Sequence, residues 1–364
     1  MAREITDPNL VARMFALPAL SHTRVALRDP RHEFGNGATS VVSLQSFARQ
    51  LSSPAPMDPR ALFVREYALI RQALRCHRQL GVLTMAFARD GELLGQLWLK
   101  ATSDKPRGAL IGRHSMCDLA IPTAYSDVSL RHLAVLVQAI QVDEIRVRLI
   151  DLRTGMGFAD ETGRVLRGLA AEGSLFLRLG EVDLMLLVTR DDQSDIESAE
   201  DAYACIPERV FFDERGPGDL RPMVRRRASP GPFGDADTTH VVSKAGPLAV
   251  GQELCAIDEL PAGRLVIRTH RDAIQRVVGQ RALDRGILLG RYDRCDVGIT
   301  DHPESRLSRV HLLVCRHGDD VLAVDTASTN GTQLKDREIR LERLADGTRL
   351  ELAKELSLTW HDPD

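Results

Sequence analysis

Short apolar runs separated by turn residues dominate the last hundred or so residues of the chain. They are rich in Val, Ile and Leu, and they lie at residues 264–267, 287–289, 311–315 and 321–324. Runs of this length, with Gly, Asp, Asn and Pro between them, are typical of strands in an all-β sandwich. Asp346-Gly347 lies between two leucines and predicts a tight hairpin turn. The alternation from Leu356 to Trp360 predicts the closing strand.

The same pattern occurs twice. Residues 107–121 align without gaps on residues 285–299, which lie 178 positions further along. Residues 129–133 then align with 308–312, and residues 150–157 with 324–331. A repeat of this length indicates two copies of one domain. We therefore expect a mainly β chain with one sandwich over residues 80–188 and a second over residues 262–364.

The segments outside the two copies have a different character. Residues 1–79 predict one or two helices: Asp58-Pro59 suits a helix start, Phe63 to Leu74 form an apolar stripe that ends before Gly81, and residues 41–51 suggest a second short helix. Residues 189–261 contain an acidic stretch, an arginine triplet and Ser229-Pro230-Gly231-Pro232, without a sustained period. This segment is predicted to be a largely disordered linker.

Composition and charge narrow the range of functions. Lys and Arg total 48 and Asp and Glu total 51, so no overall positive charge is available to hold nucleic acid or an anionic membrane. No apolar run is long enough to span a bilayer, and the first residues are polar, so we expect a cytoplasmic protein. The six cysteines lie far apart without a CxxC pair, which argues against a disulfide scaffold or a zinc site. No metal and no cofactor is expected.

Three separated motifs in the second copy lie where a sandwich has loops. They are Gly290-Arg291, Ser308-Arg309-Val310-His311 and Ser328-Thr329-Asn330-Gly331-Thr332. In this order and at these distances they resemble the forkhead-associated (FHA) domain. The resemblance covers about a hundred residues, and it implies a two-sheet sandwich whose loops at one end bind phosphothreonine peptides.

The residue types also suit that chemistry by themselves. A phosphothreonine presents close to two negative charges and three acceptor oxygens, so its site needs donors and positive charge. Arg291 supplies permanent charge, Ser308 and Thr329 supply hydroxyl donors, and Arg309 adds charge at the rim. By the resemblance, Asn330 holds the backbone of the peptide.

Other residues of the motifs are expected to be structural. Gly290 and Gly331 are turn glycines. His311, beside an apolar run, is expected to be a hydrogen-bonded framework histidine, and Asp296 and Asp325 are expected to anchor loops.

The first copy retains only part of this set. Arg113 aligns with Arg291 and Ser129 with Ser308, but Gly155, Met156 and Phe158 replace Thr329, Asn330 and Thr332. Phosphothreonine recognition is therefore doubtful there. We expect the first copy to bind a partner independently of phosphate, with Met156 and Phe158 as candidate contacts, or to pack against the N-terminal helices or the other copy; the alternative is a decayed structural domain.

No nucleotide-binding loop, nucleophile elbow or kinase signature has the right context, so the chain is not expected to be an enzyme. The prediction is a non-catalytic, phosphothreonine-dependent adaptor in serine/threonine kinase signalling, in a bacterium. Its partners would be phosphothreonine proteins such as the kinase or its substrates, and phosphorylated Thr238 or Thr239 of the linker is a possible intramolecular ligand. The alternative is a phosphate-independent scaffold that uses both sandwiches as assembly surfaces.

Overall fold

The computed structural model describes residues 58–141, 144–190, 196–206, 210–215, 254–269, 273–299 and 306–363. The helix suggested at residues 41–51 and the linker threonines Thr238 and Thr239 lie outside the described residues.

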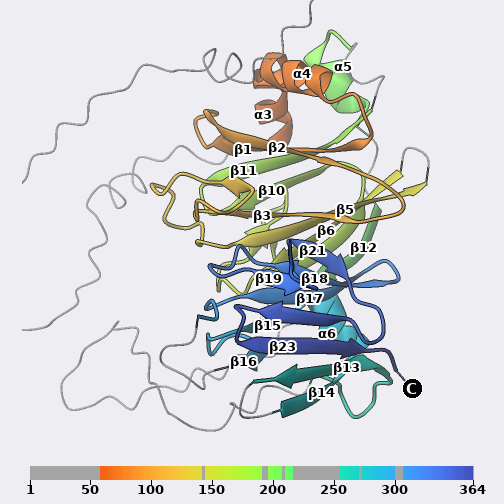
Figure 1. Cartoon of the computed structure of the whole chain (residues 1–364). Coiled ribbons are helices and arrows are strands. Elements are labelled where there is room, and N and C mark those ends of the chain that lie inside the picture. The colour runs from red at the N-terminus through yellow and green to blue at the C-terminus, as the bar shows by residue number, and fades with distance from the viewer. Residues whose placement is uncertain are drawn as a thin grey trace, which may run out of the picture. The chain divides into compact units, whose positions relative to one another are not determined.

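The first repeat is a sandwich of two six-stranded sheets, ordered β2-β1-β11-β10-β7-β8 and β12-β9-β6-β5-β3-β4 (Figure 1). Val, Leu and Ile from the facing sides of the two sheets form its core. The strands are β1 (Gly81–Ala88), β2 (Leu93–Lys100), β3 (Arg107–Gly112), β4 (Leu119–Ala120), β5 (Leu133–Gln141), β6 (Glu144–Asp151), β7 (Phe158–Ala159), β8 (Val165–Leu166), β9 (Gly168–Glu172), β10 (Leu175–Leu179), β11 (Val182–Thr189) and β12 (Val210–Arg215).

Three short helices cover the outer face of the sheet that contains β1 and β11. They are α3 (Pro59–Arg65), α4 (Tyr67–Cys76) and α5 (Ala199–Ala204). The carboxylate of Asp58 accepts a hydrogen bond from the Ala61 N–H at 3.2 Å, which caps α3 as the sequence indicates. Buried side chains on α3 and α4 pack against Phe87 and Met185, so both faces of β1 and β11 are buried.

Two features of these segments were not predicted. The apolar stripe from Phe63 to Leu74 forms two helices, which meet at Glu66. The last residue of α3, Arg65, donates from Nη2 to the carbonyl of Asp90 in the β1–β2 turn. The predicted linker contributes both α5 and β12. Strand β12 pairs antiparallel with β9, so part of the linker extends the first sandwich because the unpaired edge of β9 accepts another strand.

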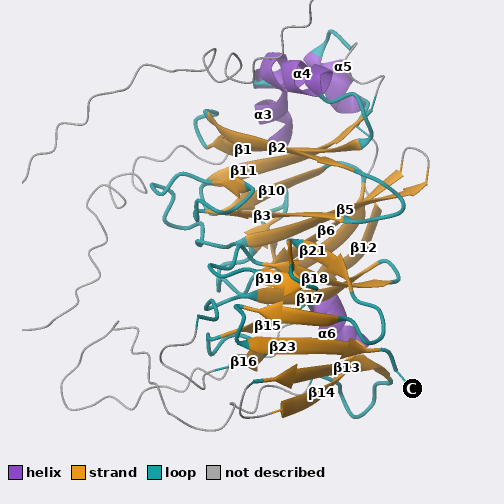
Figure 2. Ribbon diagram, viewed as in Figure 1, coloured by secondary structure: helices purple, strands orange, loops and turns teal. Residues whose placement is uncertain are grey.

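The second repeat is a sandwich of a six-stranded sheet, ordered β14-β13-β23-β22-β19-β20, and a five-stranded sheet, ordered β16-β15-β17-β18-β21 (Figure 2). All four apolar runs predicted as strands fall on its strands, except that His311 lies just before the strand that contains residues 312–315. The elements are β13 (Pro261–Arg268), β14 (Ala273–Gly279), α6 (Gln280–Arg285), β15 (Ile287–Gly290), β16 (Val297–Gly298), β17 (Leu312–His317), β18 (Asp320–Asp325), β19 (Thr332–Leu334), β20 (Arg337–Ile339), β21 (Leu341–Arg343), β22 (Arg349–Leu352) and β23 (Leu356–His361).

The turn at Asp346-Gly347 does not make the predicted hairpin. It joins β21, which pairs with β18, to β22, which pairs with β23, so the chain crosses there from one sheet to the other. The tight hairpins of this sandwich turn instead at Lys335-Asp336 and Ala353-Lys354, where both residues have positive φ without glycine. Short-range sequence signals select turn residues but not the sheet in which the next strand pairs.

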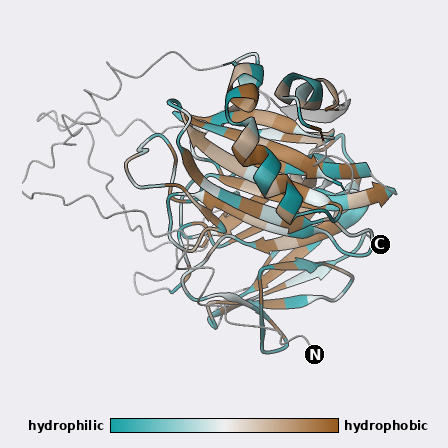
Figure 3. Cartoon of the chain, turned by 90° about the horizontal axis from the view of Figure 1, so that it is seen from above, coloured by the Kyte–Doolittle hydropathy of each residue, from teal (hydrophilic) through white to brown (hydrophobic). Residues whose placement is uncertain are grey.

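The two sandwiches pair equivalent strands in the same register. In the first sandwich β3 and β4 form a parallel pair in which Ile111 faces Leu119. In the second, β15 and β16 form the same parallel pair with Leu289 facing Val297, each residue 178 positions further along. Figure 3 shows that hydrophobic residues are concentrated on the strands.

The two sandwiches pack against each other within one compact unit. Side chains on β3, β5 and β6 form a continuous buried cluster with side chains on β15, β17 and β18. Most of its members occupy matching positions of the repeat, as Leu110 and Leu288 do, and Cys117 and Cys295. The interface therefore uses the same face of both copies, as a two-fold dimer does.

Candidate functional site

Arg291 follows the end of β15 at one end of the second sandwich. A side chain on the preceding Gly290 would place its Cβ 2.2 Å from the carbonyl oxygen of Arg309, so glycine is required for the close approach of these two segments. The backbone N–H of Arg291 donates to the carbonyl of Ser308 at 3.1 Å, and its Nε donates to the carbonyl of Leu307. The side chain is exposed, so an anion at this end of the sandwich would meet its Nη groups.

His311 connects two loops beneath this position. Its Nδ1 accepts a hydrogen bond from the Ser308 N–H at 3.1 Å, so the ring proton lies on Nε2, which donates to the carbonyl of Gly331 at 3.1 Å. Burial lowers the pKa of His311, and the nearby carboxylate of Asp325 partly opposes that shift. His311 is therefore a neutral framework group that fixes the position of Ser308 relative to Gly331.

Ser308 itself is buried and contacts the third loop. Its Oγ accepts a hydrogen bond from the Thr329 N–H at 2.9 Å, so its own hydroxyl proton remains available to a ligand. Thr329 and Asn330 are exposed beside it. The Nδ2 of Asn330 donates to the carbonyl of Arg306 at 2.6 Å, which leaves its Oδ1 for a ligand.

Asp325 organises the loop that carries Thr329 and Asn330. Its Oδ1 accepts from the Ser328 N–H at 2.8 Å, and its Oδ2 accepts from the hydroxyls of Ser328 and Thr332 at 2.6 and 2.7 Å. The sequence predicts an anchoring role for Asp325, but it gives no sign that Ser328 and Thr332 are both its donors, although both belong to the third motif.

The structure thus brings together the residues that the three motifs contribute. Arg291, Ser308, Thr329 and Asn330 come from three loops at one end of the second sandwich, with Arg309 exposed beside Ser308. One exposed guanidinium, one exposed and one buried hydroxyl, and an exposed amide form an arrangement of donors suited to an anionic ester.

The first sandwich repeats the frame of this site. Arg113 donates from its N–H to the carbonyl of Ser129 at 3.0 Å and from Nε to the carbonyl of Val128. His132 accepts from the Ser129 N–H at 3.1 Å and contacts the carbonyl of Gly157 at 2.8 Å, as His311 does in the second sandwich. Arg113 and Ser129 of the first sandwich therefore make the same backbone hydrogen bonds as Arg291 and Ser308 of the second.

The third loop of the first sandwich is built differently. Arg167 donates from Nη1 to Asp151 at 2.8 Å and from Nη2 to the carbonyl of Gly155 at 2.7 Å, and so replaces the hydroxyl that Thr332 supplies in the second copy. Nothing in the motif spacing predicts Arg167, because it reaches the loop from beyond β8. Of the two candidate contact residues, Met156 is exposed, but Phe158 is buried in the core and was assigned wrongly.

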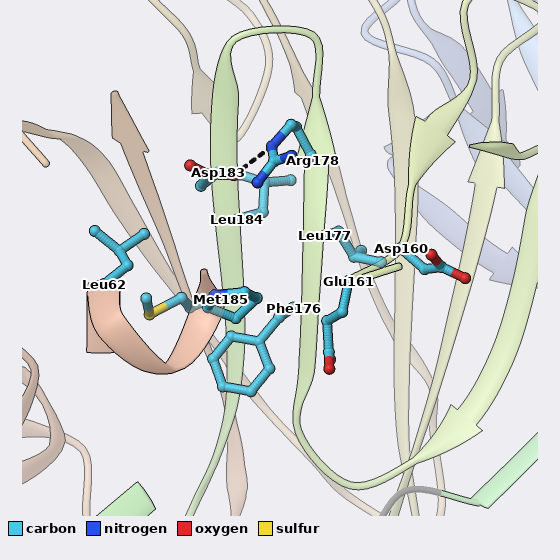
Figure 4. Close-up of a pocket in the computed structure, with 10 residues that line it drawn as sticks. Leu62, Asp160, Glu161, Phe176, Leu177, Arg178, Asp183, Leu184 and Met185 are labelled. Carbon is cyan, nitrogen blue, oxygen red and sulfur yellow. Dashed lines mark hydrogen bonds and ion pairs between the residues drawn. The ribbon is translucent and has the colours of Figure 1, made fainter. Parts of the chain in front are cut away.

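A pocket on the first sandwich is another candidate place for a ligand (Figure 4). Leu62 and Phe176 line it together with Asp160, Arg178 and Asp183. Arg178 donates to Asp183 at 2.7 Å, and Asp160 accepts hydrogen bonds within its own turn, from Thr162 and Arg164. Burial raises the pKa of Asp183. Arg178, Asp183 and Asp160 thus pair with each other or with their own turn.

Among the described residues, no group of three or more His, Cys, Asp or Glu side chains is arranged to hold a metal ion. No helix in the described part of the chain combines the length and the apolar character needed to cross a bilayer.

Comparison with known proteins agrees with the fold. Residues 287–353 match the FHA domain family. The second sandwich is therefore an FHA domain, and the first sandwich repeats its fold. No curated protein matches the chain significantly.

Several solved structures resemble part of the chain. FHA-1 of Rv1747 from Mycobacterium tuberculosis is 24% identical, and the match covers 29% of this chain and 100% of that chain with a TM-score of 0.23. The FHA domain of CT664 from Chlamydia trachomatis is 17% identical, covering 28% of this chain and 98% of that chain, with a TM-score of 0.24. EmbR from Mycobacterium tuberculosis, solved with a low affinity phosphopeptide, is 16% identical, covering 31% of this chain and 28% of that chain, with a TM-score of 0.24.

Proposed function

We propose that the chain is a non-catalytic adaptor whose second sandwich binds phosphothreonine segments of partner proteins in serine/threonine kinase signalling. The observation that carries this proposal is the convergence of Arg291, Ser308 and Thr329 on one open end of an FHA domain. Such a group offers charge and donors without a nucleophile or a base, which suits binding rather than reaction.

Each group has a distinct part in this binding. Arg291 neutralises charge on the phosphate, and Ser308 donates its hydroxyl proton to a phosphate oxygen. Thr329 and Arg309 donate from the rim of the site. Asn330 uses its free Oδ1 to accept from a backbone N–H of the bound peptide.

The first sandwich does not take part in phosphate recognition in this proposal. Arg113 and Ser129 remain, but Gly155 has no side-chain donor and Met156 cannot bridge a peptide backbone. Arg113 is also partly engaged, since its Nη1 donates to the carbonyl of Thr123 at 3.4 Å. One phosphothreonine site per chain is the expected stoichiometry.

The linker supplies a candidate intramolecular ligand. Thr238 and Thr239 lie about 20 residues before the second sandwich, and tethering over that length would give an effective concentration in the millimolar range. A phosphate on either threonine would then compete with outside ligands. Equal affinity of the modified and unmodified chains for a phosphothreonine peptide would exclude this intramolecular ligand.

Binding of a phosphothreonine peptide pool to the full chain tests the main proposal. The pool is compared with phosphoserine and unphosphorylated pools of the same sequence composition. Replacing Arg291→Ala removes charge-assisted hydrogen bonds worth about 1.5–3 kcal/mol, so binding should weaken roughly ten- to a hundredfold. Arg113→Ala, at the matching position of the first sandwich, is the control and should leave the affinity unchanged.

The alternative function, a phosphate-independent scaffold, gives a different result in the same experiment. It predicts equal capture of phosphorylated and unphosphorylated pools. It also predicts that Arg291→Ala binds as well as the parent chain. Either result would remove the phosphothreonine assignment.

A further inference from the structure

The loop ends of the two sandwiches are joined side by side. Arg131 of the first sandwich donates from Nη2 to the carbonyl of Ala327 in the second, at 2.5 Å. Arg294 of the second donates from Nη1 to the carbonyl of Arg153 in the first, at 3.0 Å. Ala327 and Arg153 occupy matching positions of the repeat, and both have a left-handed backbone with φ of 56° and 59°. The loops that carry the phosphate site therefore adjoin the corresponding loops of the first sandwich.

Those loops of the first sandwich expose large apolar side chains. Met116 is 47% exposed, Leu130 is 49% exposed and Met156 is 57% exposed. We call these three residues the apolar loop cluster. In the second sandwich the matching positions hold Arg294, Arg309 and Asn330, which are all polar. The first sandwich has thus replaced the polar rim of the site with an apolar one.

The three loops of the cluster are held against one another. The thiol of Cys117, next to Met116, donates to the carbonyl of Leu130 at 3.4 Å. His132 joins the Leu130 loop to the Met156 loop through the carbonyl of Gly157. The cluster therefore belongs to a fixed surface.

We propose that the apolar loop cluster is a second subsite for the same phosphothreonine partner, and that it takes apolar side chains from the segment flanking the phosphothreonine. This inference rests on the proposed function. The occupant of the cluster is inferred from its position beside the phosphate site. Leu130 directly precedes Arg131, whose Nη2 donates to the carbonyl of Ala327. Ala327 lies two residues before Thr329 of the phosphate site. An extended peptide advances about 3.3 Å per residue, so six residues on one side of a phosphothreonine span about 20 Å and can extend onto a neighbouring loop.

The chemistry of the cluster fits such a segment. Two of its three residues are methionines, whose flexible and polarisable side chains adapt to differently shaped apolar partners. The interface fixes the distance between the two subsites, because Arg153 also pairs with the buried carboxylate of Asp296. The first sandwich then selects among phosphothreonine segments without touching the phosphate.

A peptide scan on the full chain tests this inference. The probe is one phosphothreonine peptide with Gln at the six positions on each side, compared with peptides that carry Leu at a single position. We expect Leu at one or two of these positions to raise the affinity by roughly tenfold. The triple variant Met116→Gln, Leu130→Gln, Met156→Gln should lose this gain while binding the all-Gln phosphopeptide as the parent does.

A matched variant and the phosphate control make the outcomes distinct. Ile140 and Val277 are also exposed, so Ile140→Gln with Val277→Gln changes apolar surface elsewhere and should keep the gain. A flat scan, or a gain that persists in the triple variant, would overturn the subsite while the phosphate site stands. Loss of all phosphothreonine binding by the parent chain would overturn the proposed function and the subsite together. Equal binding of phosphorylated and unphosphorylated Leu peptides would show instead a separate, phosphate-independent partner.

Discussion

Arg153 of the first sandwich donates from Nη2 to both carboxylate oxygens of Asp296 in the second, at 2.8 and 2.7 Å. The side chain of Asp296 is fully buried and that of Arg153 is 10% exposed. The same carboxylate accepts from the Leu288 N–H at 2.8 Å, at the start of β15. The buried carboxylate of Asp296 thus forms hydrogen bonds both within the second sandwich and across its interface with the first.

The first prediction concerns the stability of this interface. Arg153→Ala leaves the carboxylate of Asp296 buried, with Arg285, at 3.4 Å, as its remaining ion-pair partner among the described residues. Removal of one partner of a buried ion pair costs about 3 kcal/mol or more, and we expect a loss of about that size in the free energy of unfolding. Urea unfolding followed by far-UV circular dichroism measures it.

The repeat offers a matched control for this variant. Arg340 pairs with Asp118, which is the counterpart of Asp296, but the side chain of Arg340 is 77% exposed. Arg340→Ala should therefore cost less than about 1 kcal/mol. In a Trp98→Phe background Trp360 is the one remaining tryptophan, so its fluorescence reports the unfolding of the second sandwich. Without an arginine substitution, this fluorescence transition should coincide with the transition measured by circular dichroism. Equal losses from the two arginine variants would contradict a buried role for Arg153.

The second prediction separates the two framework histidines. His311→Ala removes the connection between Ser308 and Gly331, so it should weaken phosphothreonine peptide binding about tenfold and destabilise the fold by about 2–4 kcal/mol. His132→Ala should cost similar stability and leave the affinity for the all-Gln phosphopeptide, which does not use the apolar loop cluster, unchanged. Fluorescence anisotropy of a labelled peptide, under conditions where Trp360 emission shows the second sandwich folded, measures the affinities. An equal effect of both variants on binding would contradict the assignment of the site to the second sandwich.

The third prediction is a pH dependence that arises from His317. This side chain lies buried in β17, and among the described residues neither ring nitrogen has a hydrogen-bond partner. Burial, with Arg148 and Arg146 adding to it, lowers the pKa of His317 to about 3. Between pH of about 6.5 and 3 the unfolded chain binds a proton at this residue that the folded chain does not, so the free energy of unfolding falls as pH falls.

His317→Gln tests this dependence, because Gln138 occupies the matching position of the first sandwich. Burial also lowers the pKa of His77, His114, His132 and His311, so these groups add to the loss of stability that the parent chain suffers in acid. The difference in unfolding free energy between variant and parent isolates His317 and should grow by about 1.4 kcal/mol per pH unit below pH 6. Urea denaturation at pH 7.5, 6 and 5 gives these values. A difference in unfolding free energy between variant and parent that stays constant with pH would rule out a neutral buried His317.

The match between prediction and structure depends on whether a feature is local. Apolar runs such as 287–289 became strands, and the alignment of Arg113 on Arg291 placed both arginines in the same backbone setting, because a repeated pattern of side chains repeats its packing. The turn at Asp346-Gly347 was misassigned because strand pairing depends on residues far away in the chain. Arg167 was missed for the same reason.

The sequence alone determined the two-copy architecture, the three polar motifs and the loss of Thr329 and Asn330 from the first copy, since each is a matter of residue type and spacing. Only the tertiary structure decided that the two copies pack through the same face, because Asp296 and Arg153 meet across 143 residues of chain. It also decided that Phe158 belongs to the core while Met156 remains exposed. Burial is set by what packs opposite a side chain, and that neighbour is fixed by the fold rather than by the local sequence.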